Sequence, residues 1–147
     1  MHFEVPHPLL VCTYTNIAVD NLVEGLAKAG VKPLRVGGNI QKSLIEHSLD
    51  YKLENHSLHP RLVRAVSEEE KLSRQISDLE NARKELNKNI WKAVNPNKSL
   101  VEREDNMRKG VIMMQNQRKN LQQKIYAIQQ EMLRDTVEAA DVVSAQI

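Results

Sequence analysis

Residues 9–26 read LLVCTYTNIAVDNLVEGL, and the change of pattern within this stretch predicts the order of its elements. The apolar run at residues 9–12 is typical of a strand that is buried on both faces. A polar break follows, after which apolar residues recur at three- and four-residue steps, as on one face of a helix. These positions are Ile17, Ala18, Leu22, Leu26 and Ala29. The stretch therefore predicts a strand, a polar turn and a helix.

A second strand is expected directly after this helix. Gly30 occupies a C-cap position, and residues 31–36, VKPLRV, have strand character up to Gly37 and Gly38. A strand, a helix and a second strand within about thirty residues make a βαβ unit, whose strands are parallel. The polar turn then lies at the carboxyl end of the first strand, which is where open α/β sheets bind their ligands.

The polar turn consists of Thr13, Tyr14, Thr15 and Asn16. Its short hydroxyl and amide side chains lie beside the unpaired amides and the positive dipole end of a helix, a combination that suits phosphate. The ring of Tyr14 offers a surface on which a base can stack. The alternative interpretation is that Thr15 or Asn16 simply caps the helix. The pattern alone leaves both interpretations open.

The same residues carry a family resemblance. Residues 11–22, VCTYTNIAVDNL, resemble motif Ia of superfamily 1 helicases, in the branch that serves RNA decay, transcription termination and replication. The sequence R-V-G at residues 35–37 resembles the end of the next strand in that family. The resemblance implies that residues 13–16 contact the backbone of single-stranded RNA or DNA. The family has a proline where Tyr14 stands, so the shape of the turn differs here.

A different periodicity begins at Pro60 and continues almost to the end of the chain. Apolar residues fall at alternating three- and four-residue steps, which is the heptad spacing of a coiled coil. The first seam is Leu72, Ile76, Leu79, Leu86 and Ile90, and the second is Leu100, Met107, Val111, Met114, Leu121, Ile125, Ile128 and Met132. A turn at residues 95–97 separates the two predicted helices, which therefore fold back as an antiparallel hairpin.

The sequence also predicts where the two helices of this arm begin and what surrounds three of its side chains. The first helix begins at Pro60 or at the capping box of Ser67, and a second capping box places the start of the other helix at Ser99. Arg83 and Arg118 occupy seam positions, where we expect them to snorkel or to pair with acids. Trp91, near the tip, either belongs to the last packing layer or is an exposed contact for a protein partner. The packing interpretation is favoured.

The end of the sequence indicates that the chain returns to its sheet. Residues 139–147, AADVVSAQI, look like the A-D-V-V element with which the helicase family re-enters the sheet, although Gln146 replaces a threonine. The expected organisation is a βαβ part with motif Ia at 1–38, a connector at 39–59, a helical hairpin insertion at 60–138 and a returning strand at 139–147. The predicted fold class is an α/β fragment of a RecA-like parallel sheet, interrupted by a long antiparallel helical hairpin.

The composition and the absence of known motifs argue against metal binding, ATP binding and catalysis by this chain. The net charge is +2, and the basic bias is confined to residues 58–98, with 9 Lys/Arg and 6 Asp/Glu. Cys12 is the only cysteine, and the histidine spacing matches no metal site, so no metal is expected. The sequence contains neither G-x-x-x-x-G-K-S/T nor a magnesium-binding acidic motif. We therefore expect no catalytic residue and no cofactor in this chain, while ATP and Mg²⁺ are implied for the parent helicase.

The sequence as a whole predicts part of a superfamily 1 helicase motor that contacts single-stranded RNA or DNA through Thr13, Tyr14, Thr15 and Asn16. Its other partners would be the remainder of the motor and a possible protein partner on the helical arm. The arm is either a solvated spacer or, as the resemblance to the helicase family implies, a brace or gate of a nucleic-acid channel. No membrane segment or leader is recognised, so an intracellular location, nuclear or cytoplasmic, is expected. The alternative is a non-enzymatic coiled-coil interaction protein with a small α/β head, which would self-associate through its arm.

Overall fold

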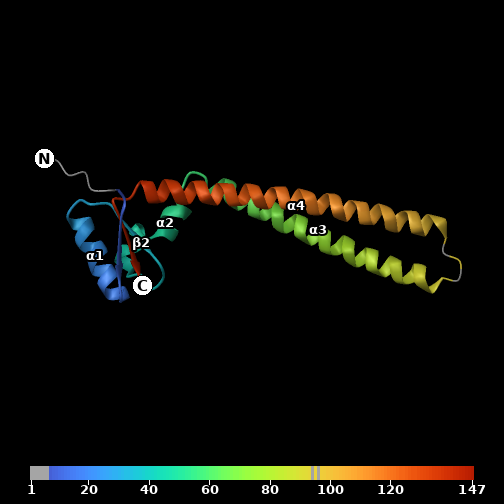
Figure 1. Cartoon of the computed structure of the whole chain (residues 1–147), viewed down its shortest axis with the longest axis horizontal. Coiled ribbons are helices and arrows are strands. Elements are labelled where there is room, and N and C mark those ends of the chain that lie inside the picture. The colour runs from blue at the N-terminus through green and yellow to red at the C-terminus, as the bar shows by residue number, and fades with distance from the viewer. Residues whose placement is uncertain (1–6, 94, 96) are drawn as a thin grey trace. The chain divides into compact units, whose positions relative to one another are not determined.

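The computed structural model describes residues 7–93, 95 and 97–147. The chain divides into two compact units, one formed by Met1–Pro60 with Ile128–Ile147 and the other by Arg61–Ala127. We refer to them as the sheet unit and the hairpin unit. The elements labelled in Figure 1 follow in the order β1 (Leu9–Thr13), α1 (Asn16–Lys28), β2 (Pro33–Val36), η1 (Lys42–His47), α2 (Leu49–Glu54), α3 (His59–Lys92), α4 (Lys98–Glu138) and β3 (Val142–Gln146).

The sheet unit is built on three parallel strands in the order β1-β3-β2. The strand β3 lies between the two strands of the βαβ unit, with Ser144 opposite both Val11 of β1 and Arg35 of β2. The chain thus leaves the sheet after β2 and returns to its centre after α4. The predicted class, an α/β parallel sheet interrupted by a long helical region, is confirmed.

The strand β1 is more exposed than its sequence predicts. Within the described residues it pairs with β3 alone, Leu10 is 69% exposed and Cys12 is also exposed. The prediction of a strand buried on both faces is therefore wrong for β1. The strand that fits this description is β2, where Pro33, Leu34 and Arg35 are all buried. It begins two residues later than the predicted start at residue 31.

Helix α1 packs through a different face from the one predicted. Val19 and Val23 are fully buried and form a core cluster with Leu44 of η1. The expected stripe is wrong at Ile17 and Ala18, which are exposed, because the buried side of the helix is the one that carries Val19 and Val23. Ala29 is exposed as well, whereas Leu22 and Leu26 are partly buried.

The end of α1 is a glycine-based cap. Gly30 has φ +78°, its N–H donates to the carbonyl of Ala27, and the N–H of Val31 donates to the carbonyl of Leu26. This pair of hydrogen bonds is the Schellman arrangement, in which a left-handed residue closes a helix. The glycine at this position thus turns the chain from α1 toward β2, as the sequence predicts.

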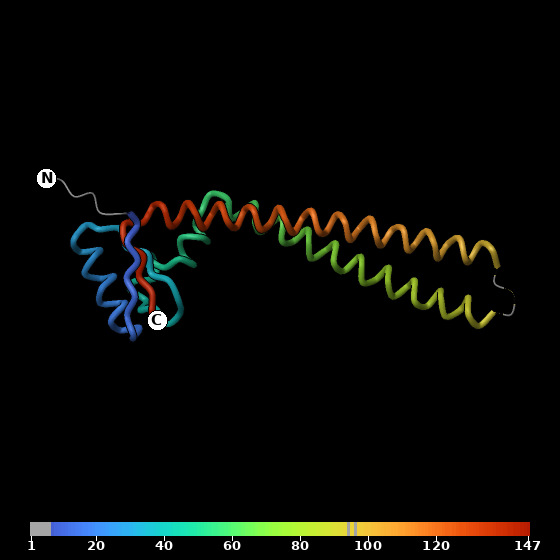
Figure 2. The backbone as a smooth tube through the Cα atoms, in the orientation of Figure 1, coloured from blue at the N-terminus to red at the C-terminus, as the bar shows by residue number. Residues whose placement is uncertain are grey.

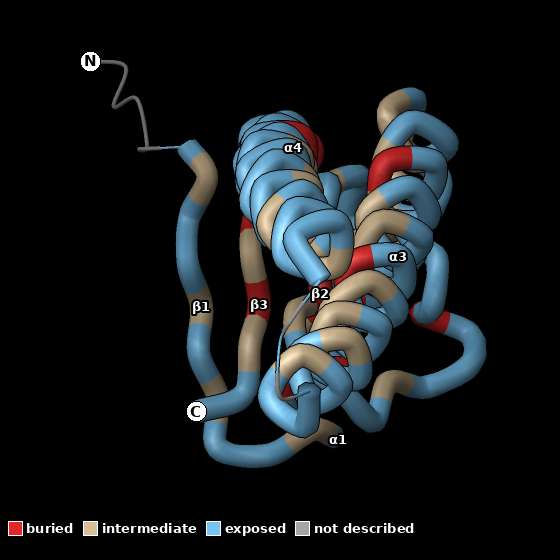
Figure 3. The backbone as a smooth tube through the Cα atoms, turned by 90° about the vertical axis from the view of Figure 1, so that its right-hand side faces the viewer, coloured by how far each residue is buried: buried red, intermediate tan, exposed pale blue. Residues whose placement is uncertain are grey.

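The hairpin unit buries the two predicted seams. On α3 the positions Leu72, Ile76, Leu79, Leu86 and Ile90 are buried or partly buried, as are Leu100, Met107, Val111, Met114, Leu121 and Ile125 on α4. Figure 3 shows buried and partly buried segments, in red and tan, at intervals along both helices. The heptad positions therefore mark the packed faces, and Figure 2 shows the two helices running along each other and spreading apart toward residues 92 and 98.

Two ion pairs fix the antiparallel register of the hairpin unit. Arg83 Nε lies 2.7 Å from Glu104 Oε1, and Arg118 Nε lies 2.7 Å from Glu69 Oε1. Arg118 lies further along α4 than Glu104, whereas its partner Glu69 lies earlier on α3 than Arg83. This order is the one that antiparallel helices require. The expectation that both seam arginines pair with acids is confirmed.

The helix ends differ from the sequence-based expectations. Helix α3 begins at His59, one residue before the predicted start at Pro60, so the alternative start at Ser67 is wrong and Ser67 lies within the helix. At the start of α4 the side-chain oxygen of Asn97 accepts from the N–H of Ser99 at 3.1 Å, so Asn97 provides the cap predicted for Ser99. Pro96, the expected helix breaker, lies outside the described residues. Trp91 is 83% exposed, so its predicted place in a packing layer is wrong.

Candidate functional site

The polar turn between β1 and α1 lies at the carboxyl edge of the parallel sheet. It follows Thr13, the last residue of β1, whose partner in the register is Gln146 at the end of β3. Because all three strands are parallel, the loop after β2 leaves from the same edge. This arrangement places the turn where α/β sheets generally bind ligands.

The turn is closed by its own hydroxyl groups. The hydroxyl of Thr13 donates to the carbonyl of Thr15 at 3.0 Å, and the hydroxyl oxygen of Thr15 accepts from the N–H of Ala18 at 3.1 Å. Thr15 is thus the N-cap of α1, with extended backbone at φ −128° and ψ 150°. The sequence-based interpretation that Thr15 caps the helix is therefore confirmed. These hydrogen bonds fix the conformation of the turn.

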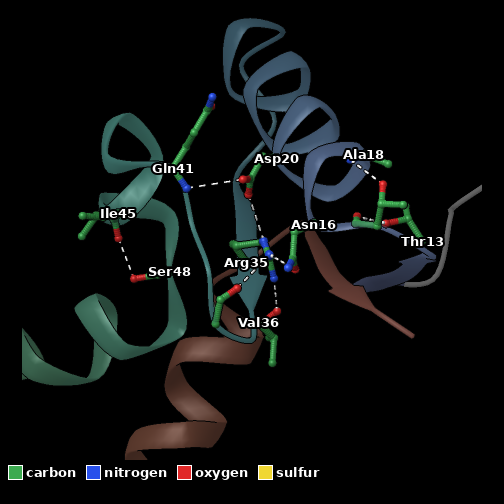
Figure 4. Close-up of polar contacts among 11 residues, drawn as sticks. Thr13, Asn16, Ala18, Asp20, Arg35, Val36, Gln41, Ile45 and Ser48 are labelled. Atoms are coloured by element: carbon green, nitrogen blue, oxygen red, sulfur yellow. Dashed lines mark hydrogen bonds and ion pairs between the residues drawn. The ribbon is translucent and has the colours of Figure 1, made fainter.

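A buried arginine holds the other side of the turn (Figure 4). Arg35 of β2 is 0% exposed, and its Nη2 donates to the side-chain oxygen of Asn16 at 3.0 Å. The Nε atom of the same guanidinium donates to Asp20 Oδ1 at 3.1 Å, while the carbonyls of Val36 and Gly38 accept the remaining hydrogen bonds. Arg35 therefore joins β2, the first turn of α1 and the loop after β2.

Asp20 carries the network further along the chain. Its second carboxylate oxygen accepts from the backbone N–H of Gln41 at 3.3 Å. Both members of the ion pair are largely enclosed, with side-chain exposures of 0% for Arg35 and 10% for Asp20. The positive charge of Arg35 is thus compensated inside the protein. The guanidinium group of Arg35 positions Asn16 and the adjacent loops, and it is not accessible to a ligand.

Tyr14 presents its aromatic ring to solvent. Its side chain is 83% exposed, and its backbone carbonyl accepts from Gln146 Nε2 at 3.0 Å. The backbone of the turn is consequently tied to the end of β3 while the phenol ring remains accessible. An accessible ring on a fixed backbone is suited to stacking against a flat ligand group.

The structure brings together all four residues named from the motif, but it gives them different surroundings. Thr13, Thr15 and Asn16 each have a partner within the protein, whereas Tyr14 presents its ring outward. The roles of Asp20 and Arg35 were not predicted from the sequence. A signal was available, since an arginine within an otherwise apolar predicted strand needs a buried acceptor.

Across residues 7–93, 95 and 97–147, no group of three or more His, Cys, Asp or Glu side chains is placed to hold a metal ion. In the same part of the chain no helix combines the length and apolarity needed to cross a membrane. The groups that the turn offers are hydroxyls, an amide, helix N–H groups and an aromatic ring.

A protein-family model matches residues 2–145, nearly the whole chain. The chain belongs to the AAA_11 family of AAA domains. Among curated relatives, this AAA domain is 41% identical over 61 residues to an ATP-dependent helicase of Methanocaldococcus jannaschii, and that alignment covers 39% of the chain. It is 35% identical over 63 residues, or 42% of the chain, to the DNA polymerase alpha-associated DNA helicase A of Schizosaccharomyces pombe.

The matched stretch is only a small part of either helicase. Each alignment covers 9% of the length of the relative. Together with the family match, the two similarities confirm the resemblance drawn from motif Ia. This AAA domain is a partial domain of the superfamily 1 helicase type.

Proposed function

We propose that this AAA domain is the part of a superfamily 1 helicase motor that holds the backbone of single-stranded RNA or DNA through the turn at residues 13–16. The observation that carries the proposal is the combination of a fixed turn backbone and the exposed ring of Tyr14 at the carboxyl edge of the sheet. The parent activity would be ATP-dependent translocation along the strand, with the turn gripping it during each step.

The way the turn is held supports this role. A strand that is gripped and released repeatedly needs a contact surface that does not rearrange, and preorganised polar groups provide one. The cap formed by Thr15, the hydrogen bond from Arg35 to Asn16 and the link from Gln146 to Tyr14 together fix the backbone of the turn. Contacts of this kind recognise phosphate and sugar and carry no direct sequence information.

ATP binding is assigned to a different part of the parent helicase. The sequence lacks G-x-x-x-x-G-K-S/T, and its glycines are Gly25, Gly30, Gly37, Gly38 and Gly110. A phosphate-binding loop needs closely spaced glycines that are followed by lysine and a hydroxyl residue, and none of these positions meets that requirement. The residues present therefore do not fit the phosphates of a nucleotide.

The test is binding of labelled oligouridylate and oligothymidylate to the full chain, measured by fluorescence anisotropy. Tyr14→Ala removes the exposed ring while leaving the backbone hydrogen bonds of the turn in place, and it is expected to weaken binding about fivefold or more, as the loss of one stacked base would. Thr13→Ala is expected to weaken binding to both polymers alike.

Tyr126→Ala is the matched control. Tyr126 lies on α4 in the hairpin unit and is 63% exposed, so this variant loses the same side chain without changing the turn. Its affinity should equal that of the unchanged protein. The proposed role of the turn is refuted if Tyr14→Ala and Thr13→Ala both bind as tightly as Tyr126→Ala.

A further inference from the structure

A basic face with an exposed aromatic ring lies near the C-terminal end of α3. Lys84, Lys88 and Lys92 recur at four-residue spacing, which places them in one row on a helix. Together with Trp91 they line a hollow of about 620 Å³ on the hairpin unit. We refer to these four residues as the tip face.

The ring of Trp91 has no part in the packing of the hairpin unit. The apolar seam of this stretch runs through Leu86 and Ile90, which are partly buried, whereas Trp91 is 83% exposed. Tryptophan is a large apolar residue with one N–H donor, and an exposed one is typical of a contact surface. The tip face therefore presents its largest apolar group to solvent.

The charge of the tip face is predominantly positive. Lys88 Nζ lies 3.1 Å from Glu85 Oε1, but both side chains are well exposed, at 65% and 72%, so the pair is weak. Within the part of the chain that the structure describes, Lys84 and Lys92 form no ion pair. Two asparagines in the same hollow, Asn81 and Asn87, add amide donors and acceptors.

We propose that the tip face is a second contact for single-stranded nucleic acid, in which a base stacks on Trp91 and the flanking phosphates contact Lys84, Lys88 and Lys92. A row of cations beside an exposed ring is the combination with which proteins hold single strands without sequence preference. This inference deepens the proposed function by adding a site in the hairpin unit, and it does not require the turn at residues 13–16 to bind.

An acidic protein segment is the competing occupant. It would be attracted by the same lysines, but it has no flat base to place against the indole ring. The asparagine amides can in addition form hydrogen bonds with base edges. The combination of ring, amides and cations therefore favours nucleic acid, and a polyanion without bases separates the two occupants experimentally.

The experiment uses the intrinsic fluorescence of the full chain. Trp91 is the only tryptophan in the protein, so its emission reports on the tip face alone. Oligothymidylate and oligouridylate are added at increasing concentration, with polyaspartate as the comparison. In parallel, anisotropy of a labelled oligonucleotide reports binding anywhere on the chain.

Three variants accompany the measurement. Trp91→Ala should weaken oligonucleotide binding about fivefold or more. The triple change of Lys84, Lys88 and Lys92 to Glu should abolish the fluorescence response and reduce the salt dependence of binding, with a log–log slope smaller by about 2. The matched control reverses the charge of Lys71, Lys119 and Lys124, three exposed lysines of the hairpin unit that lie outside the tip face.

The expected result is quenching of Trp91 by both oligonucleotides, weak or no quenching by polyaspartate, and an unchanged response in the control. Equal quenching by polyaspartate would overturn the proposal in favour of an acidic protein partner. Anisotropy that shows binding while Trp91 emission stays constant would overturn it as well. Retained quenching in Tyr14→Ala with unchanged total affinity would instead count against the turn and leave the tip face supported.

Discussion

Arg35 and Asp20 form an ion pair inside the sheet unit, with 3.1 Å between Arg35 Nε and Asp20 Oδ1 and no exposure of the arginine side chain. The pair connects a strand to the helix whose N-terminus borders the candidate site. Because the same guanidinium also binds Asn16, the geometry of the turn depends on a residue that does not belong to it. The ion pair thus links the stability of the sheet unit to the shape of its candidate binding edge.

Substitution of Arg35 by Ala should open the sheet unit locally. The change leaves Asp20 buried without its counter-charge and removes the hydrogen bond to Asn16, and losing one partner of a buried ion pair costs about 3–5 kcal/mol. Hydrogen exchange followed by mass spectrometry should show faster exchange in α1 and in residues 39–48. Arg64→Ala, at an exposed position of α3, is the control and should leave exchange in both segments unchanged. Unaltered protection of α1 in Arg35→Ala would contradict this view of the network.

Gly37 is the glycine whose replacement should disturb this network. Its φ is +105°, and a Cβ atom added there would lie 3.2 Å from Arg35 Nη1. Gly37→Ala should therefore destabilise the sheet unit by about 1–3 kcal/mol, the usual cost of a residue held in such backbone geometry. Pulse proteolysis in urea is a suitable measurement.

The neighbouring glycine provides the control. A Cβ atom at Gly38 would meet nothing within 4 Å, and its φ is not positive. Gly38→Ala should be neutral or slightly stabilising, by less than about 1 kcal/mol, because it restricts the unfolded chain. If the two substitutions changed the free energy of unfolding equally, the close approach of residue 37 to Arg35 would not contribute to stability.

The sequence predicts the hairpin unit better than the sheet unit, for a physical reason. The seams of α3 and α4 follow from a heptad period within each helix, and the partner face lies on the next helix of the chain. The sheet is assembled from distant segments, since β3 enters between β1 and β2 after both long helices. The strand order determines which strands have neighbours on both sides, and a local sequence pattern does not contain that order. The apolar run of β1 therefore predicts a buried strand, although β1 is largely exposed.

The candidate site was predictable in part. Motif Ia identifies the turn, and its position after a strand and before a helix places it at the correct edge of the sheet. The internal contacts of the turn depend on Arg35 and Gln146, whose positions beside it follow from the strand order alone. An arginine within an apolar strand signals a buried acceptor, but local sequence patterns contain no information about the strand order and so do not identify the residues that Arg35 and Gln146 contact.

Two buried serines should respond to alanine in opposite ways. Ser144 Oγ is buried and has no hydrogen-bond partner among the described residues. Ser48 Oγ donates to the carbonyl of Ile45 at 2.6 Å and accepts from the N–H of Tyr51 at 3.2 Å. Ser144→Ala should raise stability by about 1 kcal/mol because an unpaired hydroxyl is expensive to bury. Ser48→Ala should lower it by about 1 kcal/mol through loss of the α2 cap.

Thermal unfolding followed by circular dichroism compares the two serine variants under the same conditions. The expected order of midpoints is Ser144→Ala, then the unchanged protein, then Ser48→Ala. A lower midpoint for Ser144→Ala would mean that its hydroxyl contributes a favourable contact, and the assignment of an unpaired group would then be wrong.

In the hairpin unit, the hydrogen bond from Arg118 holds the pKa of Glu69 below its usual range, and a second one from Gln122 acts in the same direction. A carboxylate with a lowered pKa in the folded state stabilises the fold above its unfolded-state pKa. This contribution is lost as the pH falls through the lowered value. Arg118→Ala should raise the pKa of Glu69, so the stability difference between the two proteins should shrink on acidification.

The measurement is an NMR titration of the carboxyl carbons, with Arg108→Ala as the control. Hydrogen bonds from Arg108 and Lys109 lower the pKa of Asp105, so this control should raise the pKa of Asp105 and leave that of Glu69 unchanged. If Glu69 titrates at the same pH in Arg118→Ala and in the unchanged protein, its ionisation is independent of the cross-helix contact. The Arg118–Glu69 ion pair would then be absent in solution, and the register of the hairpin would rest on the Arg83–Glu104 pair and the apolar seams.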